Sequence, residues 1–170
     1  MNPMRQIRIE KLTLNVGAGK DQGILDKAER LIENLTGVKP VKTKTQKRIP
    51  AWGLRPGLPI GVKLTLRGKL CEELIPRLLA AKGNKLRPSN LDDAGNVSFG
   101  IQEYIDIEGA KYDPTIGIIG LQVCLTLERP GYRVKRRRVK PAKPGKRHRL
   151  TADEAKAFMQ ERFKTQFEEE

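Results

Sequence analysis

The pattern of hydrophobic and polar positions is clearest between residues 62 and 67, where apolar and polar side chains alternate one by one. A period of two is typical of a strand that buries one face and leaves the other in solvent. The apolar positions are Val62, Leu64 and Leu66, and the polar ones are Lys63, Thr65 and Arg67. One face therefore fits a hydrophobic core, while the other presents two cations and a hydroxyl that suit phosphate and ribose oxygens.

Four further segments show strand patterns. They span residues 7–16, 97–101, 105–107 and 119–127, and the last of them alternates cleanly over nine residues. In the first segment the apolar positions change phase near Glu10, which predicts a β-bulge or a twist at that residue.

Helical spacing of apolar residues predicts helices over residues 24–35 and 70–79. The first stripe consists of Ile24, Ala28, Leu31, Ile32 and Leu35. Asp21 is expected to cap this helix, and Pro76 removes one N–H from the second, which predicts a kink or a break. A capping box from Thr151 to Glu154 predicts a C-terminal helix. The mixed order predicts one α+β domain over residues 1–170, a sheet with helices on one face.

The charge of the chain is strongly positive and unevenly distributed. Its formal net charge is +14, residues 36–69 carry nine Lys or Arg, residues 129–150 carry eleven, and neither stretch contains an acid. This segregation indicates two surfaces that face a polyanion. A membrane surface attracts the same charge, but neither stretch has the interleaved apolar face of an amphipathic helix, so no membrane partner is expected.

Two basic loops are expected within these stretches, near residues 42–61 and 129–150. The first contains several prolines, which fix φ, and several glycines, which permit unusual φ, so it should have a defined shape. The second has almost no hydrophobic residues. We expect it to lack fixed structure in the free protein and to become ordered when RNA neutralises it.

The cysteines and the chain ends indicate a cytosolic protein. Cys71 and Cys124 each lie in an apolar pattern without a CxxC motif, so both are predicted to be reduced core thiols. No apolar run approaches the roughly 18 to 20 residues of a membrane span. The N-terminus lacks the apolar segment of a secretory signal.

Candidate catalytic chemistry is sparse. The segment 17–23, GAGKDQG, resembles a nucleotide loop, but Gln22 stands where a dinucleotide fingerprint needs glycine. A P-loop needs Ser or Thr after Lys20, where Asp21 stands. The sequence shows no metal-ligand spacing and no nucleophile beside its only histidine, His148. No cofactor, no metal and no enzymatic activity are expected.

Several ordered blocks carry a resemblance to a known family. They are NVGAGK, TGVKP, GLPIGVKLTLRG and NVSFGIQEYIDIEGAKYDPTIGIIGL. In this order they strongly resemble the universal large-ribosomal-subunit protein number five, and the insertion from RVKRRR to HRLTADEA resembles its archaeal and eukaryotic branch. The resemblance implies a structural ribosomal protein without enzymatic chemistry. It also implies a curved antiparallel sheet whose open face binds 5S rRNA in the central protuberance while helices cover the back.

The resemblance further implies partners and site residues. The residues expected to bind 5S rRNA are Asn15, Lys39, Trp52, Lys63, Thr65 and Arg67. The loop expected to contact the elbow of the peptidyl-site tRNA contains Gln46, Lys47, Arg48 and Arg55. Additional rRNA contacts are expected from Arg133, Lys135, Arg136, Arg137, Arg138, Lys146, Arg147 and Arg149. Large-subunit rRNA, neighbouring proteins of the central protuberance and a small-subunit head protein across the subunit bridge complete the expected partners.

Several alternatives stay open from the sequence alone. Trp52 fits stacking on RNA and equally fits an anchor in the core under its loop. Lys63 and Arg67 also fit a solvated strand face, and Val38 stands where many relatives have an RNA-contacting glutamine. A free nucleic-acid chaperone or DNA-binding protein is the second interpretation of the composition, and an RNA-processing enzyme is the third. Co-sedimentation with the large subunit would separate the first two interpretations.

Overall fold

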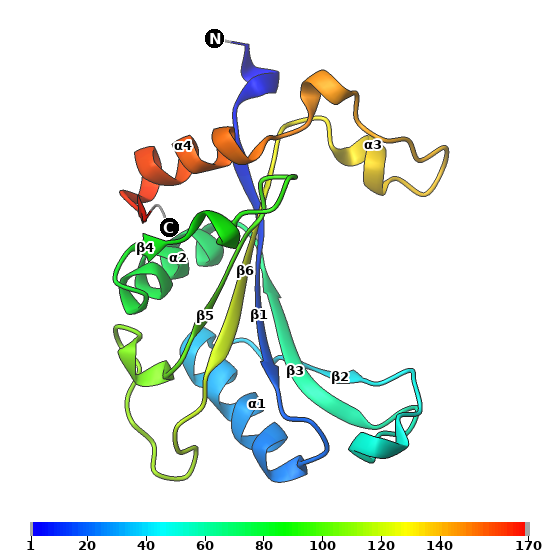
Figure 1. Cartoon of the computed structure of the whole chain (residues 1–170), viewed down its shortest axis with the longest axis vertical. Helices are drawn as coiled ribbons and strands as arrows, with labels where there is room; N and C mark the ends of the chain where they lie inside the picture. The colour runs from blue at the N-terminus through cyan, green and yellow to red at the C-terminus, as the bar shows by residue number, and fades with distance from the viewer. Residues whose placement is uncertain (1, 169–170) are drawn as a thin grey trace.

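A five-stranded antiparallel sheet, with its strands in the order β2-β3-β1-β6-β5, runs through the molecule (Figure 1). The structure is a computed structural model and describes residues 2–168. The strands of this sheet are β1 (Arg8–Gly17), β2 (Val41–Lys44), β3 (Pro59–Leu66), β5 (Val97–Ile101) and β6 (Leu121–Glu128). A separate parallel pair consists of β4 (Lys85–Leu86) and β7 (Gln166–Phe167). The predicted α+β class is confirmed.

Four α-helices accompany the sheet in the described part of the chain. They are α1 (Gln22–Thr36), α2 (Lys69–Ala81), α3 (Arg133–Arg136) and α4 (Ala152–Phe163). The predicted caps of α1 and α4 are confirmed, because Asp21 accepts from the N–H groups of Gly23 and Ile24, and Thr151 accepts from Glu154. No helix among residues 2–168 is long and apolar enough to cross a bilayer.

Helices α1, α2 and α4 pack on one face of the sheet and leave the other face uncovered (Figure 1). β1 lies in the centre, with Leu14 opposite Leu64 of β3 and Val123 of β6. All three side chains are buried against the helices, because alternate residues of a strand share one face. The predicted irregularity near Glu10 is also confirmed, since the register of β1 against β6 shifts between Ile9 and Lys11.

Two predictions about local structure were wrong, and a third was wrong in part. Residues 105–107 do not form a strand, because Tyr104–Asp106 is a 3-10 turn that buries Tyr104 and Ile107. Ile24 is 40 % exposed, and the adjacent Leu25 takes its expected place in the core. The break expected at Pro76 is absent, because α2 continues through it, while the kink stays a prediction. Pro76 lies on the exposed side of the helix, where water can satisfy the carbonyl that loses its N–H partner.

Three strands were not predicted from the sequence: β2 and the two-residue strands β4 and β7. β2 reads VKTK, and its side chains are mostly exposed on both faces, so it shows no hydrophobic alternation. It is an edge strand that pairs through its backbone with β3, and its lysines discourage pairing with a further chain.

The second basic segment, residues 129–150, is held at both ends, although the sequence predicts a run without fixed structure. Arg129 is buried, and its Nη2 donates to Glu154 Oε1 of α4 over 2.6 Å. The Tyr132 hydroxyl accepts from the N–H of Leu150 over 3.0 Å and donates to the His148 carbonyl over 3.3 Å. These bonds join residues near 130 to residues near 150, so the segment is a closed loop with defined ends.

The Glu154 carboxyl completes this closure electrostatically. Partial burial alone would raise its pKa, but the bonds from Arg129 and from the Thr151 backbone and side chain outweigh it and leave the pKa below its usual value. The ionised carboxyl therefore stabilises the fold at neutral pH. This contribution is lost as the pH falls through the lowered folded-state pKa.

We expect Leu64→Ala to lower the free energy of unfolding by about 2 to 5 kcal/mol, because it leaves a cavity under β3. The matched control is Lys63→Ala, one residue away on the exposed face, where a change within about 0.5 kcal/mol is expected. Urea unfolding followed by circular dichroism measures both. If Lys63→Ala proved the more damaging variant, the two faces of β3 would have to be exchanged.

We expect Glu154→Gln to destabilise the fold at pH 7 by about 1 kcal/mol, because Gln keeps the capping bond to Thr151 but removes the charge that faces buried Arg129. The figure is kept low because the Glu154 side chain is 41 % exposed. The difference from the unmodified chain should disappear as the pH falls through the lowered folded-state pKa of Glu154. Glu161→Gln on the same helix is the control, and a pH-independent difference would contradict the role of the Arg129 pair.

Candidate nucleic-acid interface

The uncovered face of the sheet is lined by small polar, amide and cationic side chains. We call this surface the open face. Its residues are Lys11, Thr13 and Asn15 of β1, Val41 and Thr43 of β2, Lys63 and Thr65 of β3, Ser98 and Gly100 of β5, and Gln122, Cys124 and Thr126 of β6. Arg67 follows directly at the end of β3 and is exposed.

Strand register brings three predicted site residues together on the open face. Asn15 lies opposite Lys63, and the adjacent Thr13 lies opposite Thr65. Asn15 Nδ2 also donates to Gln122 Oε1 on the neighbouring β6 over 2.9 Å. A row of polar groups thus crosses three strands, with a cation at one end.

The two predicted cations of this strand remain available for a ligand. Among residues 2–168, no ion pair involves Lys63 or Arg67. These cations share a broad exposed surface with the hydroxyls of Thr13 and Thr65, which suits a polyanion.

The first basic loop, residues 45–58, has the defined shape that its glycines and prolines predict. Thr45 bonds across the loop to Leu58 and Gly57, and residues 49 and 54 form a bridge beneath a 3-10 turn. Gly53 ends this turn with φ +67°, a conformation that favours glycine. The loop is therefore preshaped rather than extended into solvent without internal bonds.

The predicted loop residues project from this frame. Gln46, Lys47, Arg48 and Arg55 are all exposed. Trp52 is 67 % exposed, so the interpretation as a core anchor is wrong. Trp52 lies at the loop turn with these residues and not on the sheet with Asn15. Lys39 is exposed in the segment before β2.

Not every cation of residues 36–69 lies on the open face. Lys42 lies opposite Val62, on the helix side of the sheet. Its ammonium pairs with Asp26 over 2.8 Å and with Glu29 over 3.1 Å, both on α1. The hydrogen bond from Lys42 lowers the pKa of Asp26, so this cation fixes the edge strand to the helix layer.

The second basic loop lies over one end of the open face. Arg136 of α3 pairs with Glu10 over 2.6 Å and with Glu128 over 3.1 Å. Glu128 is buried, and Arg8 donates to its other carboxylate oxygen over 2.9 Å. These ion pairs neutralise the two carboxylates at this end of the sheet. Arg136 therefore stabilises the fold through contacts within the chain.

The other predicted residues of this loop lie in α3, directly after it, and in or beside the 3-10 turn Lys146–His148. Arg133, Lys135, Arg137, Arg138, Lys146, Arg147 and Arg149 are all exposed. Arg137 and Arg149 donate through Nε to carbonyls of their own loop, those of Lys140 and Pro144, over 2.7 and 3.1 Å. Among residues 2–168, neither Arg137 nor Arg149 forms an ion pair. The two basic loops extend to the same side of the sheet from its opposite ends (Figure 1).

Two residues of the open face depart from the sequence analysis. Cys124 is exposed on β6 between Thr13 and Ser98, so its prediction as a core thiol was wrong, whereas Cys71 is buried as predicted. Gln122, the hydrogen-bond partner of Asn15, was not predicted as a site residue. The alternation over residues 119–127 contains the missing signal, because residues 122 and 124 are out of phase with the buried positions.

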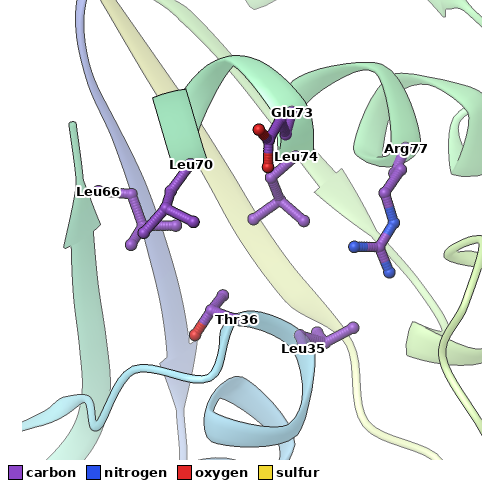
Figure 2. Close-up of a pocket in the computed structure, with 7 residues that line it drawn as sticks. All are labelled: Leu35, Thr36, Leu66, Leu70, Glu73, Leu74 and Arg77. Atoms are coloured by element: carbon purple, nitrogen blue, oxygen red, sulfur yellow. The ribbon is translucent and has the colours of Figure 1, made fainter. Parts of the chain in front are cut away.

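The helix side offers a different kind of surface. A pocket of about 340 Å3 lies between the end of α1 and α2 (Figure 2). Its lining residues are Leu35, Thr36, Leu66, Leu70, Glu73, Leu74 and Arg77. Arg77 Nε donates to the Glu108 carbonyl over 2.7 Å, which holds this side chain at the rim. Within the described residues, no three His, Cys, Asp or Glu side chains are grouped as a metal site.

Comparisons with known proteins agree with this architecture along nearly the whole chain. The family model described as "Ribosomal protein L5" matches residues 2–55, and the model for the C-terminus of the same ribosomal family matches residues 59–163. "Large ribosomal subunit protein uL5" of Nanoarchaeum equitans is 53 % identical over 97 % of this chain and 98 % of its own length. The proteins of the same name from Sulfurisphaera tokodaii and Nitrosopumilus maritimus are 51 % and 44 % identical, over 96 % and 95 % of this chain and 93 % and 94 % of their own.

These matches cover the sheet, the covering helices and most of both basic loops. They agree with the resemblance in the sequence blocks, and the shared part of the chain includes residues of both basic loops. The chain therefore belongs to the uL5 family of large-ribosomal-subunit proteins, which are structural, non-enzymatic constituents of the ribosome in the cytoplasm.

Proposed function

We propose that this chain binds 5S rRNA in the central protuberance of the large subunit through the open face. The observation that carries the proposal is the uncovered, polar side of the sheet, where Asn15, Lys63 and Thr65 lie together in register. The family resemblance supports the proposal, because it implies that Asn15 and Thr65 match RNA-contacting positions. Lys63 and Arg67 supply charge without a partner among residues 2–168.

The chemistry of the open face supports RNA rather than a small ligand. Lysine and arginine bind phosphate oxygens, and threonine and serine hydroxyls can bond to ribose 2′-OH groups. Binding of this kind releases counterions, so the affinity should fall steeply with salt. The second basic loop adds cations at one end of the same face, where we propose contacts with further rRNA.

We also propose that the first basic loop contacts the peptidyl-site tRNA. The loop is fixed by its own backbone bonds, and it carries Gln46, Lys47, Arg48 and Arg55 on its exterior. A preshaped loop loses little conformational entropy on binding, which suits a contact that must form and break with each tRNA. Exposed Trp52 offers a flat surface to a base or a sugar at the same place.

The remaining proposed partners are proteins. The helix side is less basic than the open face, and the segment after β5 carries the exposed side chains Tyr112 and Ile118. Apolar exposure of this kind suits contact with another protein more than contact with phosphates. We assign this side to neighbouring ribosomal proteins of the central protuberance and to a small-subunit head protein across the subunit bridge.

We expect the double variant Lys63→Glu/Arg67→Glu to fold normally and to bind 5S rRNA at least about 100-fold more weakly, a change of about 3 kcal/mol. Both side chains are exposed, so their reversal removes phosphate contacts and adds repulsion without disturbing the core. Filter binding at moderate salt measures the affinity. Lys27→Glu/Lys82→Glu is the control, because it changes the net charge equally on the helix side, in α1 and just after α2. Equal losses in both variants would show that only net charge matters.

We expect Lys47→Ala/Arg48→Ala/Arg55→Ala to keep 5S rRNA affinity within about threefold, under about 0.7 kcal/mol. Large subunits that carry this variant should hold peptidyl-site tRNA less firmly, because charge-assisted contacts are lost. Trp52→Ala, measured beside it, isolates any stacking. Loss of 5S binding with unchanged tRNA retention would overturn the tRNA assignment and give the whole loop to 5S rRNA.

A further inference from the structure

The hydrogen-bonded pair of Asn15 and Gln122 stands out on the open face. The two residues lie directly opposite each other on β1 and β6, and Asn15 Nδ2 donates to Gln122 Oε1 over 2.9 Å. This bond joins the two carboxamides and limits the rotation of each side chain. Lys63 flanks the pair on β3, and Gly100 flanks it on β5.

Two glycines beside the pair have no role in the chain's own packing. A Cβ added at Gly17 or at Gly100 would meet no atom within 4 Å, and neither residue has a positive φ. Gly61 differs, because a Cβ there would approach the Val16 carbonyl oxygen at 2.8 Å. Glycine weakens a strand, and one that the fold does not require often marks the close approach of a ligand. Open space therefore adjoins the amide pair both along β1 and across to β5.

Each carboxamide of the pair keeps one polar group outside their shared hydrogen bond. With Asn15 Nδ2 bonded to Gln122 Oε1, Asn15 Oδ1 remains an acceptor and Gln122 Nε2 remains a donor. Reversing both carboxamides would exchange the residues that carry these groups and would leave the same two groups. A donor and an acceptor on one hydrogen-bonded pair, both neutral, match the edge of a nucleobase better than they match a phosphate, which accepts only.

We propose that Asn15 and Gln122 read the edge of one unpaired adenine of the bound RNA, with the ring lying against the backbone at Gly100. This inference rests on the proposed function of the open face and names a base-specific subsite within it. Adenine is chosen because side-chain amides pair bidentately with its amino group and adjacent ring nitrogen. Unpaired bases are the usual targets of sequence-specific RNA recognition, and Lys63 beside Asn15 is placed to bind a phosphate near the same nucleotide.

Two variants test the subsite while preserving the fold. Gln122→Ala removes the donor and the partner of Asn15, and we expect it to weaken 5S rRNA binding about tenfold or more. Gly100→Val fills the open space, and we expect a similar loss of affinity with an unchanged or higher melting temperature, because valine favours strands. Gln160→Ala, at an exposed position of α4, is the matched control. Affinity of Gly100→Val equal to that of the unmodified chain would overturn the proposal.

The identity of the base is tested by analogue interference on 5S rRNA. Transcripts carrying purine riboside or 7-deaza-adenosine at random adenines are bound to the protein, and the bound and free pools are sequenced. We expect interference at one adenine or a few with the unmodified chain, and loss of that interference with Gln122→Ala. An interference pattern that is the same for the unmodified chain and for Gln122→Ala would overturn the adenine assignment. Interference found only at other bases, tested with matching analogues of those bases, would also overturn it.

Alkylation of Cys124 separates this proposal from the broader one. Cys124 is exposed two residues from Gln122, whereas burial of Cys71 raises the pKa of its thiol to about 11 and keeps it unreactive. We expect 5S rRNA to protect Cys124 from N-ethylmaleimide. Protection without adenine interference would overturn only the base subsite. Binding without protection would overturn the open face as the RNA surface.

Discussion

Burial of one face of the sheet against the helices is the constraint on which the rest of the structure depends. β1 lies in the centre, and its residues Leu12 and Leu14 are completely buried between the neighbouring strands and the helix layer. Because strand side chains alternate, burying these leucines fixes Thr13 and Asn15 on the opposite face. A register slip by one residue would place the polar groups in the core. The same alternation therefore determines both the stability of the fold and the composition of the open face.

Acid–arginine pairs provide the second constraint, because they hold the long basic loop in place. Eleven cations in residues 129–150 would repel one another and extend if nothing opposed them. Glu154 binds Arg129 at the base of the loop, and Glu10 and Glu128 bind Arg136 in α3. These few carboxylates direct the loop over the end of the open face and leave most of its cations on the exterior. A polyanionic partner thus meets a surface that is already arranged.

How far the candidate site could be predicted differs from one group of residues to another. Lys63 and Thr65 were placed on the polar face from alternation alone, and the structure agrees. Cys124 was assigned to the core because thiols are often buried, although its phase along β6 already indicated the open face. The sequence does not single out Gln122, because its hydrogen-bond partner Asn15 lies 107 positions away in the sequence. A lone aromatic in a loop has no periodicity to place it, so the sequence alone allows two interpretations of Trp52.

The sequence by itself determined the elements with strong periodicity, the helix caps and the segregation of charge, because each depends on residues within a turn or two of one another. Tertiary structure alone decided which residues meet across strands. It recruited β2, whose sequence carries no alternation, through backbone pairing with β3. It also placed Asn15 against Gln122, and it tied residues 129–132 to residues 148–154 through Arg129 and Tyr132. Such contacts depend on register and chain path, which local propensity does not encode.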